Sequence, residues 1–177
     1  MSPDSLDRLR AAVRDVPDFP QPGILFKDIT PVLADPALLR EAVNGMAEAF
    51  AGREVDKVVG IDARGFIFGA LLAERLGAGF VPVRKKGKLP WRTRGCEYDL
   101  EYGSNAIEMH LDALAPGERV VLADDLLATG GTAGAAMRLI EETGAELLGV
   151  AFFIELAFLN GRDRLADSAP VHALLTY

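Results

Sequence analysis

The stretch from Arg119 to Ala136 constrains the fold more than any other part of the chain. It opens with a short apolar run, Val120 to Ala123, typical of a parallel strand covered on both faces. Two acids follow, Asp124 and Asp125, and a helix is expected from Ala133 to Thr143. Side chains alternate along a regular strand, which would send the two acids to opposite faces. Both acids can reach one ligand only if the strand has already ended, so we predict that it ends before them. The stretch therefore predicts a ligand site at the carboxyl end of a strand in an α/β sheet.

The loop between the acids and the helix is suited to an anion. Adjacent glycines permit close backbone approach, threonine hydroxyls donate, and the N–H groups of a helix N-terminus point outward. We therefore expect a phosphate to bind at Ala128, Thr129, Gly130, Gly131 and Thr132. No lysine follows Gly131 and the glycines are adjacent, which excludes both a Walker loop and a dinucleotide fingerprint. The acids would repel phosphate, so they should face a sugar diol or a metal ion.

This string closely resembles the motif with which type I phosphoribosyltransferases bind phosphoribosyl pyrophosphate (PRPP). A second strand, Val55 to Ile61, leads into Asp62-Ala63-Arg64-Gly65, which is similar to the pyrophosphate-binding loop of the same family. Arginine suits that role, because its fork of donors matches phosphate oxygens. The resemblance implies that this loop binds pyrophosphate and carries a cis or strained peptide near Asp62 and Ala63.

Six of the 19 lysines and arginines lie between Arg84 and Arg94, although the net charge is −7. We predict a structureless connection from Arg84 to Tyr98 within a flexible lid loop of about 84–104, since long loops in compact domains often serve as lids. A closing lid would surround a polyanion, with Arg84, Lys85 and Lys88 at the pyrophosphate. The resemblance also implies that cations here serve the neighbouring subunit of a homodimer.

Three segments narrow the resemblance to family members that use adenine: Pro20 to Pro31, Gly87 to Pro90 and Leu100 to Gly103. It implies that Phe26 stacks on the base, as an apolar ring suits a flat purine. Further implied site residues are Leu25 and Lys27 at adenine, with Glu101, Asp124 and Asp125 as the catalytic carboxylates. The implied reaction moves the phosphoribosyl group from PRPP to N9 of adenine, giving AMP and pyrophosphate. Mg2+ is the expected cofactor, held mainly by PRPP oxygens and water.

The remaining pattern predicts one domain, 1–177, in which about 1–34 form a helix and a small base-binding hood. We expect helices over Ser5 to Asp15, from the cap Asp35 to about Phe50, and from Phe66 to Leu76. Further strands are expected at Phe80–Val83, Glu146–Leu156 and Val171–Leu175, and the segment from Tyr98 to Leu111 alternates like a hairpin. Strands that alternate with helices indicate a central, mainly parallel sheet covered on both faces, the type I phosphoribosyltransferase architecture.

Composition argues against several other classes of protein. No apolar stretch reaches membrane-spanning length and the N-terminus lacks a signal-peptide core, so we expect a soluble, cytoplasmic protein. The acidic balance argues against a nucleic-acid partner, and a single cysteine excludes an internal disulfide. Two alternatives stay open: a phosphoribosyltransferase for another nucleobase, and a non-catalytic regulator that senses PRPP on the same fold.

Overall fold

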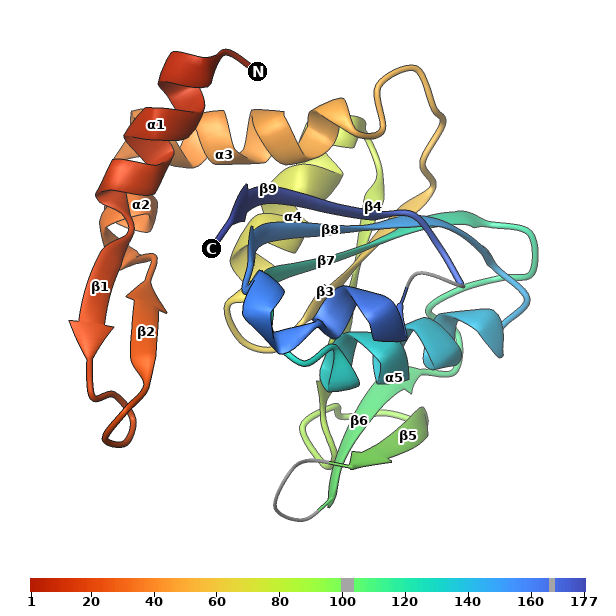
Figure 1. The fold of residues 1–177 in the computed structure, drawn as a ribbon. Coiled ribbons are helices and arrows are strands. Elements are labelled where there is room, and N and C mark those ends of the chain that lie inside the picture. Colours follow the sequence, from red (N-terminus) through yellow and green to blue (C-terminus); the bar gives the residue numbers. More distant parts are fainter. Residues whose placement is uncertain (100–103, 166–167) are drawn as a thin grey trace.

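The structure is a computed structural model that describes residues 1–99, 104–165 and 168–177 (Figure 1). A seven-stranded sheet with the order β5-β6-β4-β3-β7-β8-β9 forms its centre. Five neighbouring strands are parallel: β4 (Gly79–Lys85), β3 (Lys57–Ile61), β7 (Arg119–Leu127), β8 (Glu146–Glu155) and β9 (Val171–Thr176). The other two are antiparallel: β5 (Thr93–Asp99) and β6 (Ser104–His110). The predicted α/β class with a mainly parallel sheet is confirmed.

Helices cover both faces of the sheet, as Figure 1 shows. One face packs against α1 (Pro3–Ala12), α2 (Thr30–Ala34), α3 (Pro36–Glu48) and α4 (Gly65–Leu76). The other packs against α5 (Gly131–Glu141), with the short 3-10 helices η1 (Ala157–Leu159) and η2 (Gly161–Arg164) nearby. The strands serve both layers because side chains alternate: Val58 lies in the first apolar cluster and Val59 in the second.

Most predicted element boundaries hold within a few residues. Asp35 caps α3 by accepting hydrogen bonds from the backbone N–H groups of Ala37 and Leu38, at 2.8 and 3.1 Å. The first helix begins and ends earlier than predicted: it starts at Pro3, after the cap Ser2, and ends at Ala12. The next residues form a strand, because they pair with an antiparallel strand that begins at Leu25, and helical spacing does not show that pairing.

That partner creates a separate hairpin near the N-terminus. β1 (Arg14–Pro17) pairs with β2 (Leu25–Asp28), and the proline-rich segment between them makes the turn. In Figure 1 the hairpin hangs beside the main sheet, below α1 and α2. It occupies the place of the predicted hood segment.

The predicted structureless connection from Arg84 to Tyr98 is wrong at its first two residues, which belong to β4, and in its second half. β5 begins at Thr93 and pairs with β6 from Thr93↔His110 to Asp99↔Ser104. Glycine and proline in this segment favour a loop locally, but pairing with β6 stabilises a strand. Closure of the segment over a ligand stays a prediction. Within the described ranges, the helices are too short or too polar to cross a membrane.

Candidate active site

The two adjacent aspartates lie inside a strand, not after one. β7 continues to Leu127 and pairs with β8 through Asp124↔Phe152 and Leu127↔Glu155, so the predicted strand end is wrong. Backbone pairing with a long neighbour extends the strand, whereas pairing with β3 stops at Ala123.

Side-chain alternation is nevertheless interrupted at the aspartates. Leu122 packs in the cluster on the α5 side and Ala123 in the cluster on the α4 side. Beyond the acids the order is reversed, with Leu126 on the α4 side and Leu127 on the α5 side. Both carboxylates consequently line one cavity of about 420 Å3. A shared contact with one sugar therefore stays a prediction.

Asp124 is held against the loop that precedes α4. Its Oδ1 accepts a hydrogen bond from the backbone N–H of Asp125 at 2.8 Å. A Cβ added to Gly65 would lie 2.5 Å from the same oxygen, so the loop can approach only because Gly65 has no side chain. Desolvation, together with the neighbouring charge of Asp125, raises the pKa of Asp124 above its usual range.

Asp125 has a different partner. Its Oδ2 lies 2.5 Å from Nε of Arg64, and its side chain is only 9% exposed. Arg64 also lies over the Phe26 ring, with 5.3 Å from Cζ to the ring centroid. The Asp62–Ala63 peptide preceding it is cis, as predicted. Asp62, Ala63 and Arg64 line the same cavity as the two aspartates.

The predicted phosphate loop forms a second cavity of about 100 Å3, lined by Asp124 and residues 126–133. Gly130 has a φ of +79° and immediately precedes α5, whose first N–H groups lack intrahelical acceptors. Asp124, Leu126 and Thr132 line both cavities, so the two adjoin. The loop and the acid pair thus form one extended site.

Two supports of this loop were missed by sequence reasoning. A Cβ on Gly161 would lie 2.0 Å from the Ala128 carbonyl oxygen, so η2 packs directly on the loop backbone. The hydroxyl of Thr132 donates a hydrogen bond to the Tyr98 hydroxyl on β5 at 3.1 Å. Neither contact has a local signal, because the partners are more than 30 residues apart.

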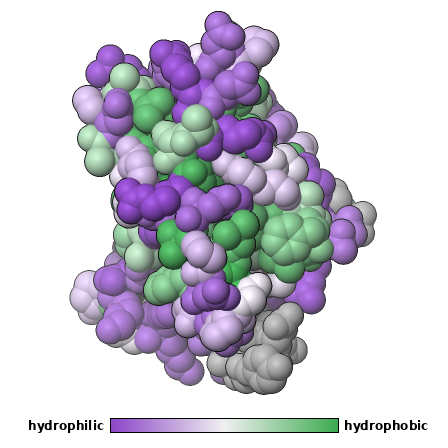
Figure 2. All heavy atoms as spheres, turned by 60° about the vertical axis from the view of Figure 1, so that its left-hand side comes forward, coloured by the Kyte–Doolittle hydropathy of each residue, from purple (hydrophilic) through white to green (hydrophobic). Residues whose placement is uncertain are grey.

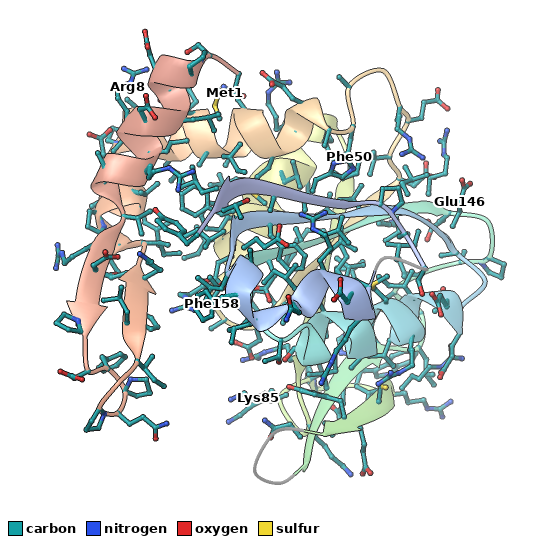
Figure 3. All side chains as sticks on the ribbon, in the orientation of Figure 1. Met1, Arg8, Phe50, Lys85, Glu146 and Phe158 are labelled. Atoms are coloured by element: carbon teal, nitrogen blue, oxygen red, sulfur yellow. The ribbon has the colours of Figure 1, made fainter. Side chains whose placement is uncertain are left out.

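The three cations predicted at the pyrophosphate, Arg84, Lys85 and Lys88, do not lie together. Nε of Arg84 lies 3.0 Å from Asp62 Oδ2, so Arg84 contacts the Asp62–Gly65 loop. Its Nη1 donates to the Lys88 carbonyl at 2.9 Å, while the Lys88 side chain is exposed. Lys85 lines a separate cavity of about 320 Å3 with Lys86, Glu97 and Asn105. Figure 3 labels it near the β5–β6 end of the molecule.

The hairpin carries the three predicted base-binding residues. Phe26 is half-buried and meets Phe19 edge to face at 5.1 Å, while the Leu25 side chain is 50% exposed. Lys27 instead binds Asp15 at 2.6 Å, so its ammonium does not face Phe26 across the strand. Figure 2 turns the hairpin side forward and shows apolar surface among hydrophilic residues there.

Two further predictions concern Glu101 and the Mg2+ cofactor. Glu101 lies outside the described residues, so its role stays a prediction. Among residues 1–99, 104–165 and 168–177, three or more His, Cys, Asp or Glu side chains do not gather as a metal site. Mg2+ typically needs only one or two carboxylates when substrate phosphates and water complete its shell, and the aspartate pair fits such an ion.

The chain is similar to known proteins over most of its length. A family model of the phosphoribosyl transferase domain matches residues 30–175. The adenine phosphoribosyltransferase of Anaeromyxobacter dehalogenans is 59% identical over 172 residues, covering 97% of this chain and 99% of that protein.

Solved structures extend the likeness to the whole fold. The crystal structure of adenine phosphoribosyltransferase from Rhodothermus marinus has a TM-score of 0.95 at 56% identity, covering 99% of this chain and 100% of that one. The enzyme from Saccharomyces cerevisiae, crystallised with an imino-altritol bisphosphate and adenine, has a TM-score of 0.91 at 42% identity over 97% of this chain and 98% of its own. The chain therefore belongs to the phosphoribosyltransferase family, and within it to the adenine phosphoribosyltransferases.

Proposed function

We propose that this protein transfers the 5-phosphoribosyl group from PRPP to N9 of adenine, releasing pyrophosphate and forming AMP for purine salvage. The observation that carries the proposal is the adjoining pair of cavities, which share Asp124, Leu126 and Thr132. Phosphate, ribose and pyrophosphate are consecutive parts of PRPP. The two cavities offer a matching series: the loop of residues 128–132, the aspartate pair and the Asp62–Gly65 loop. We place the reaction in the cytoplasm, since so highly charged a substrate does not cross a bilayer unaided.

The phosphate groups of PRPP would bind at the two ends of this site. The backbone of residues 128–132 and the N-terminus of α5 would hold the 5'-phosphate. Arg64 would take the pyrophosphate, with the backbone of the Asp62–Gly65 loop around it. Arg84 would assist from its contact with Asp62.

The aspartates would act on the ribose between these ends. Each carboxylate can accept hydrogen bonds from ribose hydroxyls, and together they favour the positive charge that develops as the bond from C1 to the pyrophosphate oxygen breaks. N9 of adenine then forms the new bond at C1 and loses its proton. By its resemblance, Glu101 would assist that proton transfer.

The base would stack on Phe26. Leu25 pairs with Pro17, which has no N–H, so the Leu25 carbonyl receives no hydrogen bond from its partner in register. That carbonyl can accept a hydrogen bond from the amino group of adenine. In this arrangement Lys27 would contribute backbone groups, since its ammonium is occupied by Asp15.

PRPP oxygens and water would hold Mg2+ chiefly, with Asp124 and Asp125 as the protein carboxylates that could assist. Its contribution, when bound, is to neutralise charge on the leaving pyrophosphate. The protein residues hold and orient the groups that surround it.

The active form would be a homodimer. The outer side of α4 exposes Ile67 and Leu71, one helical turn apart, at 38% and 37%. Two such apolar side chains on a helix with little polar surface suit a second copy of the chain. Lys85, which lines a separate cavity, and the exposed Lys88 would then serve the partner's pyrophosphate.

A direct assay tests the proposed reaction. The protein is mixed with PRPP, Mg2+ and adenine, hypoxanthine, guanine, xanthine or orotate in turn, and nucleotide is measured. We expect AMP from adenine and no nucleotide from the other bases. Nucleotide from another base alone would support the alternative transferase, and none from any base would leave only the PRPP-binding regulator.

Subunit complementation tests the dimer. We expect light scattering to give twice the chain mass, and a variant with Ile67→Glu and Leu71→Glu to give one chain mass. Two weakly active variants, Arg64→Met and the double variant Lys85→Ala, Lys88→Ala, should regain activity when mixed. No recovery would place the lysines outside the partner's site.

A further inference from the structure

We infer that Tyr177 is a positioning residue for the base site, because its ring holds the β1–β2 hairpin in place through Lys27. The inference rests on the proposed function, in which Phe26 of that hairpin is the platform for adenine. Tyr177 itself lies beyond β9, on the main body of the molecule, and does not touch the proposed base position.

The contact joins the hairpin to the body. Nζ of Lys27 lies 4.0 Å from the centroid of the Tyr177 ring, which is within the range of a cation–π interaction. The same ammonium binds Asp15 on β1 at 2.6 Å. The Lys27 side chain is only 10% exposed, so this charge is largely removed from water and depends on both partners.

Strand alternation explains why the lysine anchors the hairpin instead of binding the base. Neighbouring residues of β2 point to opposite faces, so Phe26 and Lys27 cannot serve the same ligand with their side chains. Phe26 meets Arg64 of the pyrophosphate loop, and Lys27 meets Tyr177. The hairpin is thus tied to the body from two sides.

Substrate binding should affect the two contacts, Arg64 with Phe26 and Lys27 with Tyr177, differently. In the proposed reaction Arg64 turns to pyrophosphate, so its contact with Phe26 is the one that PRPP alters. The contact between Lys27 and Tyr177 uses no group assigned to either substrate. It can therefore keep Phe26 in position while adenine enters.

Tyr177 is itself fixed by groups other than its side chain. Its backbone N–H donates to the Glu155 carbonyl, and its carbonyl accepts from the N–H of Ala157, both at 2.9 Å. The guanidinium of Arg10 on α1 lies 5.0 Å from the ring and donates to the Thr176 carbonyl at 2.8 Å. A substitution at Tyr177 therefore removes the ring and leaves the backbone bonds.

Steady-state kinetics of four variants test the inference. Tyr177→Leu should raise the KM for adenine about three- to tenfold, because part of the ensemble loses the binding-competent hairpin position. The KM for PRPP and kcat should stay within about twofold. Tyr177→Phe keeps the ring and should behave like the unchanged protein. Lys27→Met should reproduce the effect of Tyr177→Leu, and the double variant should be no worse than either single one.

Two controls separate this idea from its alternatives. Arg10→Met removes the other cation at the ring and should leave the adenine KM unchanged. Phe26→Ala tests the platform: if it leaves the adenine KM unchanged, the proposed base site fails. If Phe26→Ala raises that KM but Tyr177→Leu does not, or if Tyr177→Phe is as poor as Tyr177→Leu, the positioning role is wrong and the proposed function survives.

Discussion

Arg64, in the loop between β3 and α4, and Asp125, within β7, form an ion pair with 2.5 Å between Nε and Oδ2. The pair joins the Asp62–Gly65 loop to β7. Asp125 is buried, and a carboxylate in that setting needs a partner. Under the proposed function, pyrophosphate and Asp125 would compete for the same guanidinium, and pyrophosphate binding would release Asp125 toward the ribose.

Replacing Arg64 tests this exchange. Arg64→Met should raise the KM for PRPP about ten- to a hundredfold, the usual loss when a charge-assisted hydrogen bond disappears. Arg64→Lys should recover only part of it, since an ammonium lacks the planar fork of donors. Product inhibition by pyrophosphate should weaken in parallel. An unchanged KM for PRPP in the methionine variant would remove Arg64 from the pyrophosphate site.

Gly65 should be intolerant of any side chain. In Gly65→Ala the added carbon would lie 2.5 Å from Oδ1 and 3.1 Å from Cα of Asp124, so the aspartate and its strand must move. We expect about 1–3 kcal/mol of lost stability and a large fall in kcat. Gly134→Ala is the matched control, as its added carbon meets only Leu165 at 3.6 Å and should stabilise α5 slightly. Equal kinetics for both variants would contradict the proposed role of this close approach.

Gly161 supports the phosphate loop from outside the recognisable motif. Its added carbon in Gly161→Ala would collide with the Ala128 carbonyl oxygen, and Gly130 N would lie 3.0 Å away. The loop must shift, so the KM for PRPP should rise about tenfold while the KM for adenine changes little. Isothermal titration with ribose 5-phosphate should show the same loss of affinity. Unaltered binding would mean that the loop tolerates displacement.

Many of the residues that line the two adjoining cavities could be predicted from the sequence, because their signals are local. The glycine-rich loop, the paired acids and the arginine turn each occupy a few consecutive residues, and the alternation of strands and helices places them at one sheet edge. The Asp62–Ala63 peptide belongs to the same class of local feature.

The contacts that hold this surface together were not predictable in the same way. Thr132 with Tyr98, Gly161 with Ala128 and Lys27 with Tyr177 each join residues more than 30 positions apart. The strand through Asp125 is likewise stabilised by its neighbour β8, whereas the local pattern favoured an earlier end. Pairing and packing across the fold override local preference at these places.

Acid should weaken the fold partly through His172 on β9. Burial and the nearby charges of Arg162 and Arg53 lower its pKa below 6.5, and its ring meets Phe50 edge to face at 5.5 Å. As pH falls through about 6.5 the unfolded chain takes up the proton first, so stability declines until the folded pKa is reached. Urea unfolding should show a smaller loss between pH 8 and pH 5.5 in His172→Gln. An identical loss in both proteins would assign the acid sensitivity to other groups.

Asp124 and Asp125 should respond to amide substitution with opposite signs. Desolvation and the charge of Asp125 raise the pKa of Asp124, so the folded state holds its proton more tightly than the unfolded chain does. The carboxyl group therefore stabilises the fold below its unfolded pKa of 3.8, and that stability is lost as pH rises through the folded pKa. Asp124→Asn keeps an oxygen to accept from the Asp125 N–H and removes the charge, so its Tm at pH 8 should exceed that of the unchanged protein.

The contrast with the neighbouring position makes the test specific. Asp125→Asn removes the partner of Arg64, so it should lower the Tm where Asp124→Asn raises it. Both should reduce kcat about a hundredfold, because both carboxylates are proposed to favour the charge that forms at C1. The Tm gain of Asp124→Asn should shrink when unfolding is followed near pH 4. A lower Tm for Asp124→Asn at pH 8 would mean that the charged carboxylate stabilises the fold, and the proposed conflict between stability and catalysis at this position would be wrong.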